Sequence, residues 1–119
     1  MSVTGLPPYD DANIFARILR GEIPCKRVHE DEHALAFHDI QPQAPVHLLV
    51  VPRRHLASLN EAGDAVLLGR LLMAARQAAA RAGLEQYRLV VNTGADAGQS
   101  VAHLHLHVLG GRVMAWPPG

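Results

Sequence analysis

The stretch His103-Leu104-His105-Leu106-His107-Val108-Leu109 places a histidine at every second position near the end of the chain. Because side chains alternate between the two faces of a β-strand, this spacing predicts a strand with three imidazoles on one face and aliphatic residues on the other. Histidine titrates near neutral pH, so such a row can supply a nucleophile, a proton donor and an orienting partner. We therefore expect the reactive centre of the protein to lie on this strand.

The overall composition restricts the classes of protein to which the chain can belong. Its 119 residues are enough for one domain with a buried core. The 11 Lys and Arg residues balance the 11 Asp and Glu residues, so no net charge attracts nucleic acid or anionic lipid. Cys25 is the only cysteine, which excludes an internal disulfide and fits a reducing compartment. With no signal peptide and no apolar run that spans a bilayer, we expect a cytoplasmic protein that binds neither nucleic acid nor membrane.

Helix and strand signals follow one another along the chain. Apolar spacing predicts a short helix over residues 14–19 and a long Ala/Leu helix that follows the capping box 58–61 and ends at Gly83. Alternating or continuous apolar runs predict five strands, at residues 26–30, 34–38, 47–51, 89–91 and 103–109. The short connections indicate an α+β fold with an antiparallel five-stranded sheet, one long helix and one short helix.

The domain organisation is simple. Residues 1–12 are interpreted as a flexible N-terminal lead-in, and residues 13–119 as a single domain whose C-terminal tail spans residues 110–119. The pair Arg53-Arg54 is interpreted as a solvated turn. Four histidines match no catalytic role and are expected to face solvent or form hydrogen bonds: His29, His33, His38 and His55.

Zinc binding is an alternative use of the histidine row. The Cα atoms of residues i and i+4 in a strand lie about 13 Å apart, whereas zinc–nitrogen bonds are about 2.0–2.1 Å long. Three successive imidazoles of one strand therefore converge poorly on one ion, although two of them together with His47 could do so. No cysteine pair lies nearby, and we predict neither a metal site nor another cofactor.

The residues before the row favour phosphate chemistry. Gly94, Gly98 and Ser100 belong to a turn of small residues whose backbone N–H groups and one hydroxyl could cradle an anion. A neutral imidazole can attack phosphorus while a second imidazole and fixed donors stabilise the phosphoryl oxygens. Asp39, at the end of a predicted strand, could accept hydrogen bonds from ribose hydroxyls; it could equally be an ordinary turn carboxylate.

These residues carry a resemblance to a known family. The stretch His103–Leu109 resembles the signature of the histidine triad (HIT) superfamily. A wider match resembles its Hint branch, on Ile14–Ile18, Ala36–Pro45, Val91-Asn92, Gly98–Ser100, Gly110–Arg112 and Trp116–Gly119. This resemblance implies a HIT-like fold and a homodimer whose sheets join across the interface. It also implies a purine nucleoside phosphoramidase, which hydrolyses the P–N bond of adenosine 5′-phosphoramidates.

The resemblance assigns catalytic roles to five residues. His105 would be the nucleophile and form an adenylyl-histidine, oriented by the backbone and side chain of His103. His107 and Ser100 would contact the phosphate or pass a proton to the leaving amine. His47 would not touch the substrate itself but would support the residues that do.

The resemblance also assigns residues to substrate binding. Asp39 would hold the ribose, and Trp116 would meet the leaving amine, although relatives commonly carry a histidine where this chain has Ala115. The remaining nucleotide-binding residues would be Ile40, Asn92, Gly98 and Gln99, with Ile14, Phe15, Ile18, Ile23 and Phe37 around the base.

Two other functions share the histidine row. A diadenosine polyphosphate hydrolase of the Fhit type would carry the same triad but should lack the Trp-Pro-Pro-Gly end. A non-catalytic nucleotide-binding regulator is the second alternative, against which the intact triad with Ser100 and Asn92 argues.

Overall fold

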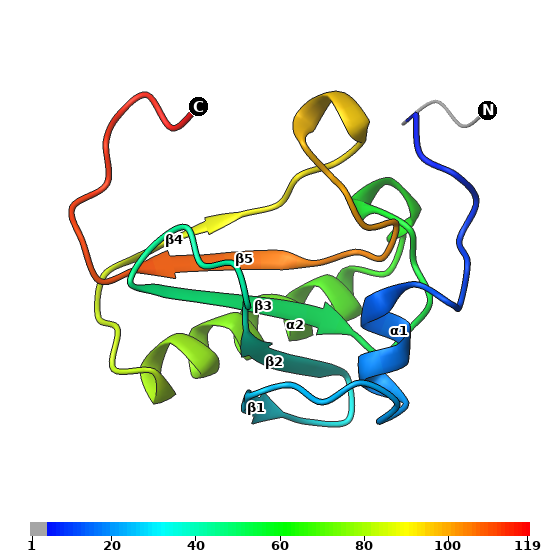
Figure 1. Cartoon of the computed structure of the whole chain (residues 1–119), viewed down its shortest axis with the longest axis horizontal. Helices are drawn as coiled ribbons and strands as arrows, with labels where there is room; N and C mark the ends of the chain where they lie inside the picture. The colour runs from blue at the N-terminus through cyan, green and yellow to red at the C-terminus, as the bar shows by residue number, and fades with distance from the viewer. Residues whose placement is uncertain (1–4) are drawn as a thin grey trace.

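The computed structural model describes residues 5–119 and shows one antiparallel sheet with helices on both faces (Figure 1). The strands are β1 (Arg27–Glu30), β2 (Ala34–His38), β3 (Val46–Pro52), β4 (Tyr87–Val90) and β5 (Leu106–Gly110). The helices are α1 (Ile14–Leu19) and α2 (Ala65–Arg81), with short 3-10 turns η1 (Leu59–Glu61) and η2 (Ala95–Ala97). The strand order is β1-β2-β3-β5-β4, which confirms the predicted α+β class and the five-stranded antiparallel sheet.

Strand β5 lies inside the sheet, between β3 and β4. His107 pairs with Leu49 of β3 and with Val90 of β4. The strand begins at Leu106, so the prediction of a strand over 103–109 was too long at its start. Residues 101–103 before it form a bend, and Leu104 N–H donates to the Leu56 carbonyl over 2.7 Å.

The predicted alternation of side chains along this stretch is present. Leu104, Leu106 and Val108 are buried in a core between the sheet and α2, together with small residues such as Ala74 and Ala78. The opposite face of the sheet packs against α1 through a second apolar cluster that includes Phe15, Ile18 and Phe37. Figure 1 shows α1 and α2 on these two sides of the sheet. The histidines therefore belong to the side covered by α1.

The start of the long helix differs from the prediction. Ser58 caps the η1 turn, where its hydroxyl accepts from Asn60 N–H, and α2 begins only at Ala65. The N-cap of α2 is Asp64, whose carboxylate accepts from the N–H groups of Val66 and Leu67. Val66, in the first turn of this helix, is 67% exposed. It follows the cap on the solvent side of the first turn, whereas Leu67 is buried.

Strand β4 also differs from the predicted strand over 89–91. It spans Tyr87–Val90 and pairs only with β5, so it forms an edge of the sheet. Tyr87 and Leu89 are each 37% exposed. An apolar run predicts a strand but does not distinguish a central from an edge position.

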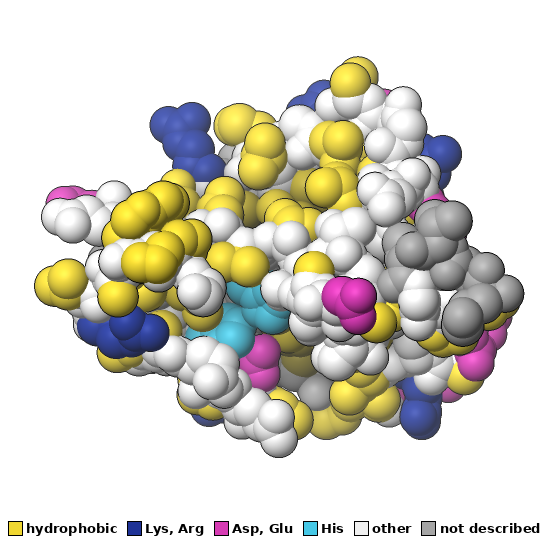
Figure 2. Space-filling view, turned by 90° about the horizontal axis from the view of Figure 1, so that it is seen from above, with side chains coloured by type: hydrophobic (Ala, Val, Ile, Leu, Met, Phe, Trp, Pro, Cys, Tyr) yellow, Lys and Arg dark blue, Asp and Glu magenta, His cyan; other side chains and the backbone are white. Residues whose placement is uncertain are grey.

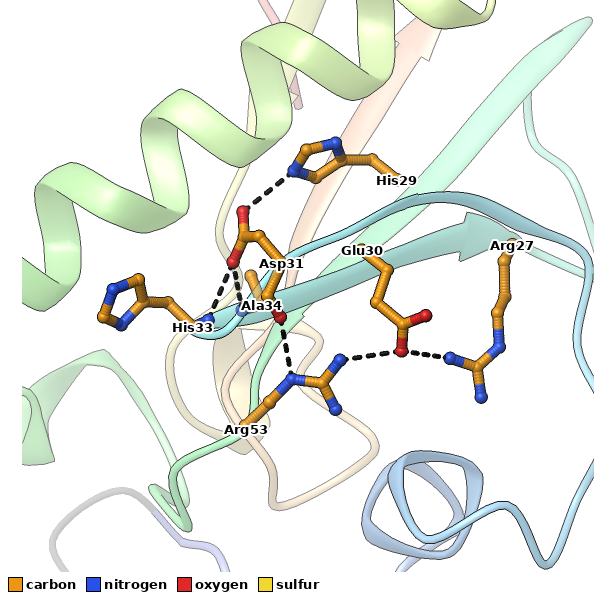
Figure 3. A network of polar contacts seen from close by, with 7 residues as sticks. All are labelled: Arg27, His29, Glu30, Asp31, His33, Ala34 and Arg53. Carbon is orange, nitrogen blue, oxygen red and sulfur yellow. Dashed lines mark hydrogen bonds and ion pairs between the residues drawn. The ribbon is translucent and has the colours of Figure 1, made fainter.

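A polar network ties the hairpin between β1 and β2 to the end of β3 (Figure 3). The Asp31 carboxylate accepts from the N–H groups of His33 and Ala34 and lies 2.8 Å from the buried His29 ring. Arg53 donates to the Asp31 carbonyl over 2.9 Å and to Glu30 over 2.7 Å. Arg53 is therefore a half-buried link between strands, which corrects its interpretation as part of a solvated turn.

Candidate active site

A cavity of about 350 Å³ opens beside α1 on the histidine side of the sheet. Pockets for drug-sized ligands typically measure about 300–1,000 Å³, and the volume of this cavity lies within that range. Figure 2 shows histidine side chains in a hollow of the surface, next to acidic side-chain atoms. The cavity is lined by Ile14, Phe15, Ile18, Ile23, Pro24, Cys25, Phe37, His38, Asp39, Ile40, Gln41, Leu49, Ser100, Val101, His105 and His107.

His105 is held in one orientation on the wall of this cavity. Its Nδ1 lies 2.7 Å from the carbonyl oxygen of His103, and a carbonyl can only accept, so Nδ1 carries the proton. The Phe15 ring packs edge-on against the imidazole, with centroids 4.9 Å apart. Burial lowers the pKa of His105 below its ordinary value. The ring is therefore neutral near pH 7, with an unprotonated Nε2 that no hydrogen bond engages within residues 5–119.

The His103 ring is fully buried and is bonded at both nitrogens. Nε2 lies 3.0 Å from the Pro52 carbonyl oxygen, and Nδ1 lies 2.8 Å from the Tyr9 hydroxyl. Burial lowers the pKa of His103 to about 4. This histidine contacts His105 through its main chain and does not line the cavity.

A chain of hydrogen bonds sets the tautomer of His107. The backbone N–H of Gln43 donates to Nδ1 of His47 over 3.0 Å, so the proton of neutral His47 is on Nε2. That Nε2 lies 2.8 Å from Nδ1 of His107, which must then accept. The neutral His107 ring consequently carries its proton on Nε2. Burial, with His105 and His47 close by, lowers the pKa of His107 to about 4.

Asp39 joins this pair and creates the one group in the described part of the chain suited to a metal ion. Its carboxylate lies 3.5 Å from Nε2 of His47 and also accepts from Gln41 N–H over 2.8 Å. Ligand atoms of Asp39, His47 and His107 all lie within 4.8 Å of one another. The two imidazoles already share a hydrogen bond, so an ion would have to displace the proton between them. The group uses only one histidine of the triad.

The small-residue loop before the triad is braced by its own side chains. Gln99 is buried; its Oε1 accepts from Gly94 N–H, and its Nε2 donates to the Ala57 and Val101 carbonyls. Asn92 Nδ2 donates to the Ala97 carbonyl over 2.7 Å. These two amides hold the loop shape, whereas Ser100 reaches the cavity wall.

The apolar residues expected around the base come together. Five side chains predicted from the resemblance line the cavity, and Ile40 joins them with 89% of its surface exposed. The sequence did not predict a role for Leu49, Val101, Pro24 or Cys25, which also line it. Leu49 was identifiable only as a member of the apolar run 47–51, and the fold decides which face of such a run meets a cavity.

Trp116 lies apart from the cavity of its own chain. It is 81% exposed, and the Arg88 guanidinium lies 5.9 Å from the centre of its ring. Arg88 also donates to the Ala115 carbonyl over 2.9 Å. The tail thus runs beside edge strand β4 and leaves the indole uncovered among the described residues.

Comparison with known proteins points to one family. A family model described as HIT domain matches residues 20–114. An uncharacterized HIT-like protein of Synechocystis is 53% identical over 109 residues, which are 89% of this chain and 96% of that protein. The crystal structure of a HIT family hydrolase from Legionella pneumophila has 49% identity and a TM-score of 0.85, covering 90% of this chain and 99% of that one. A histidine triad nucleotide-binding protein from Candida albicans has 29% identity and a TM-score of 0.78, covering 89% and 83%.

Proposed function

The chain belongs to the HIT domain family, and we propose that it hydrolyses the P–N bond of purine nucleoside 5′-phosphoramidates through an adenylyl-histidine on His105. The observation that carries this proposal is the fixed tautomer of His105. Because its Nδ1 proton is donated to the His103 carbonyl, the nucleophilic lone pair is on Nε2, on a cavity wall. An unprotonated imidazole nitrogen beside an anion-binding loop supports attack on phosphorus.

The first step forms a bond between His105 Nε2 and phosphorus and breaks the P–N bond to the amine. The departing nitrogen needs a proton, which the His47–His107 pair supplies. The pair is neutral in the free protein; with the anionic substrate it takes up one proton, on Nδ1 of His47 or of His107, and gives up one hydrogen bond of the chain from Gln43. The two rings share this proton, so it belongs to the pair rather than to either residue.

The second step releases the nucleotide. Water attacks phosphorus, the pair accepts the proton of the water, and the P–Nε2 bond breaks to regenerate neutral His105. Throughout both steps the His103 carbonyl keeps the proton on Nδ1, so that the phosphorylated ring is a positively charged and therefore good leaving group.

The walls of the cavity support a nucleoside monophosphate as the bound group. Asp39 offers a carboxylate oxygen to the ribose hydroxyls, and Phe15 and Phe37 offer apolar surface to a base. Ser100 and the backbone of the loop that Gln99 braces provide donors for the phosphate.

A homodimer completes the proposed enzyme. Edge strand β4 offers unpaired backbone groups for joining the sheets of two subunits. Trp116 is uncovered within its own subunit, and in a dimer it would reach the leaving-group side of the partner's cavity.

No helix among the described residues is both long and apolar enough to cross a membrane.

A substrate panel tests the function. We expect turnover of AMP and GMP phosphoramidates by pure protein, with diadenosine polyphosphates cleaved far more slowly. Preferred cleavage of the dinucleotides would favour the Fhit-type alternative. Nucleotide binding without turnover of any substrate would favour a non-catalytic regulator.

A further inference from the structure

Tyr9 reaches the buried end of the triad from a segment that precedes the family match. The matched region begins at residue 20, yet the Tyr9 hydroxyl lies 2.8 Å from Nδ1 of His103. Leu6 of the same segment is buried, and Gly5 passes close to Ala95 of η2. We expected residues 1–12 to be a flexible lead-in; residues 1–4 lie outside the described residues, and the contacts of Leu6 and Tyr9 were not predicted.

The direction of the Tyr9 hydrogen bond follows from the other side of the His103 ring. Nε2 faces the Pro52 carbonyl, which only accepts, so Nε2 carries the proton. In the neutral ring Nδ1 is then an acceptor, and the Tyr9 hydroxyl is its donor. His103 has no exposed surface, so no solvent contact replaces this donor in the folded protein.

The Tyr9 ring is itself held in place. It stacks on His55 with centroids 4.9 Å apart and an interplanar angle of 19°. Directly after it, Asp10 accepts from the N–H groups of Ala12 and Asn13, and Asn13 caps α1. The segment that places Tyr9 on His103 therefore continues into the helix that places Phe15 on His105.

We propose that Tyr9 is a positioning residue for the nucleophile: its hydroxyl fixes the His103 ring, and His103 in turn presents its carbonyl to Nδ1 of His105. This inference rests on the proposed role of His105. Without the hydroxyl, a buried acceptor is left unpaired, and the His103 ring and backbone relax toward another donor. The His103 carbonyl then no longer fixes one tautomer and one orientation of His105.

The test uses Tyr9→Phe, which keeps the aromatic stack and removes the hydroxyl. With an AMP phosphoramidate as substrate, we expect kcat to fall about 10-fold, with KM within about twofold of wild type. His33→Gln changes a half-exposed ring on the β1–β2 hairpin, outside the cavity lining, and should leave both constants unchanged. Tyr9→Leu, which also removes the stack, should be at least as impaired, and thermal melting of each variant shows whether it is folded.

Nitrogen NMR of histidine-labelled protein gives a readout that does not need turnover. In the wild type, His103 should show a hydrogen-bonded, unprotonated Nδ1, and His105 a protonated Nδ1. In Tyr9→Phe, the His103 Nδ1 resonance should move toward that of a free lone pair, and the His105 resonances should shift with it. A wild-type protein inactive on every phosphoramidate would overturn the proposed function, and the His105 shifts would then decide the role of Tyr9 alone. Unchanged His105 resonances, or a kcat within twofold of wild type, would overturn this role.

Discussion

The Nδ1 atom of His105 and the carbonyl oxygen of His103 lie 2.7 Å apart, so the backbone of His103 sets the tautomer of His105, the candidate nucleophile. A second link, from Gln43 through His47, sets the tautomer of His107 in the opposite sense. The two cavity imidazoles are thereby distinguished as acceptor and donor before any substrate arrives.

Replacement of Asp39 should affect binding more than chemistry. Its carboxylate lines the cavity 3.5 Å from His47, and a ribose contact would stabilise ground and transition states alike. We expect Asp39→Ala to raise KM about 10-fold, the loss of one charge-assisted hydrogen bond, with kcat nearly unchanged. Steady-state kinetics separate the two constants. A large fall in kcat at constant KM would assign Asp39 to the proton transfer instead.

Stability should fall as the pH drops from 7 to 4. The folded protein lowers the pKa of His103 to about 4, while in the unfolded chain histidine titrates near its ordinary value of about 6.5. The unfolded state therefore binds the extra proton first, and the stabilisation present above pH 7 is lost as the pH falls to about 4. For this fully buried ring the loss is on the order of 3 kcal/mol.

Urea unfolding midpoints measured from pH 7.5 to 4 check this dependence. His103→Gln removes one of the two rings whose pKa lies at about 4 and should make the curve less steep, with His107 accounting for part of the remaining slope; His33→Gln, on the half-exposed hairpin, is the control. Identical pH dependence in wild type and His103→Gln would contradict the assignment of the acid sensitivity to His103.

Turnover should not require a metal ion. The proposed steps use a nitrogen nucleophile and an imidazole pair, and the proton between His47 and His107 occupies the place that an ion would need. We expect full activity after exhaustive chelation, with metal content measured on the same sample. Activity that is lost on chelation and restored only by added zinc would favour a metal at Asp39, His47 and His107.

The tail should act on the leaving group. We expect the protein to be a homodimer, and we expect deletion of residues 116–119 to change the ranking of amine leaving groups while His105 remains reactive. Val113→Ser, a change at a 93% exposed side chain of the same tail, is the matched control. Sedimentation and a leaving-group series are the measurements. A monomer at assay concentration, or the same ranking after truncation, would remove this role from Trp116.

Most of the fold was predictable from local patterns, because alternation and helical spacing report which side of an element is buried. The side assignment of Leu104, Leu106 and Val108 was correct on this basis. The edge position of β4 and the late start of α2 at Ala65 were not predicted, since both depend on which segments pair and pack. Local apolar patterns contain no such information.

Part of the candidate site was likewise predictable from the sequence, and part was not. The triad and the apolar cavity residues were identifiable from spacing and resemblance, and the structure brings the expected cavity residues together. The contacts that set tautomers were not identifiable: the Gln43 N–H, the Pro52 carbonyl and the Tyr9 hydroxyl are 4, 51 and 94 residues from their histidine partners. Two of these three groups are backbone atoms, which carry no residue-specific signal.

The most direct test of the account is to locate the covalent intermediate. Wild-type protein is mixed with an AMP phosphoramidate, quenched during turnover under conditions that preserve P–N bonds, digested and examined by mass spectrometry. We predict the adenylyl group on His105, and we predict that both the adduct and the activity are lost in His105→Ala. An adduct on His103 or His107, with the rate retained in His105→Ala, would contradict this prediction.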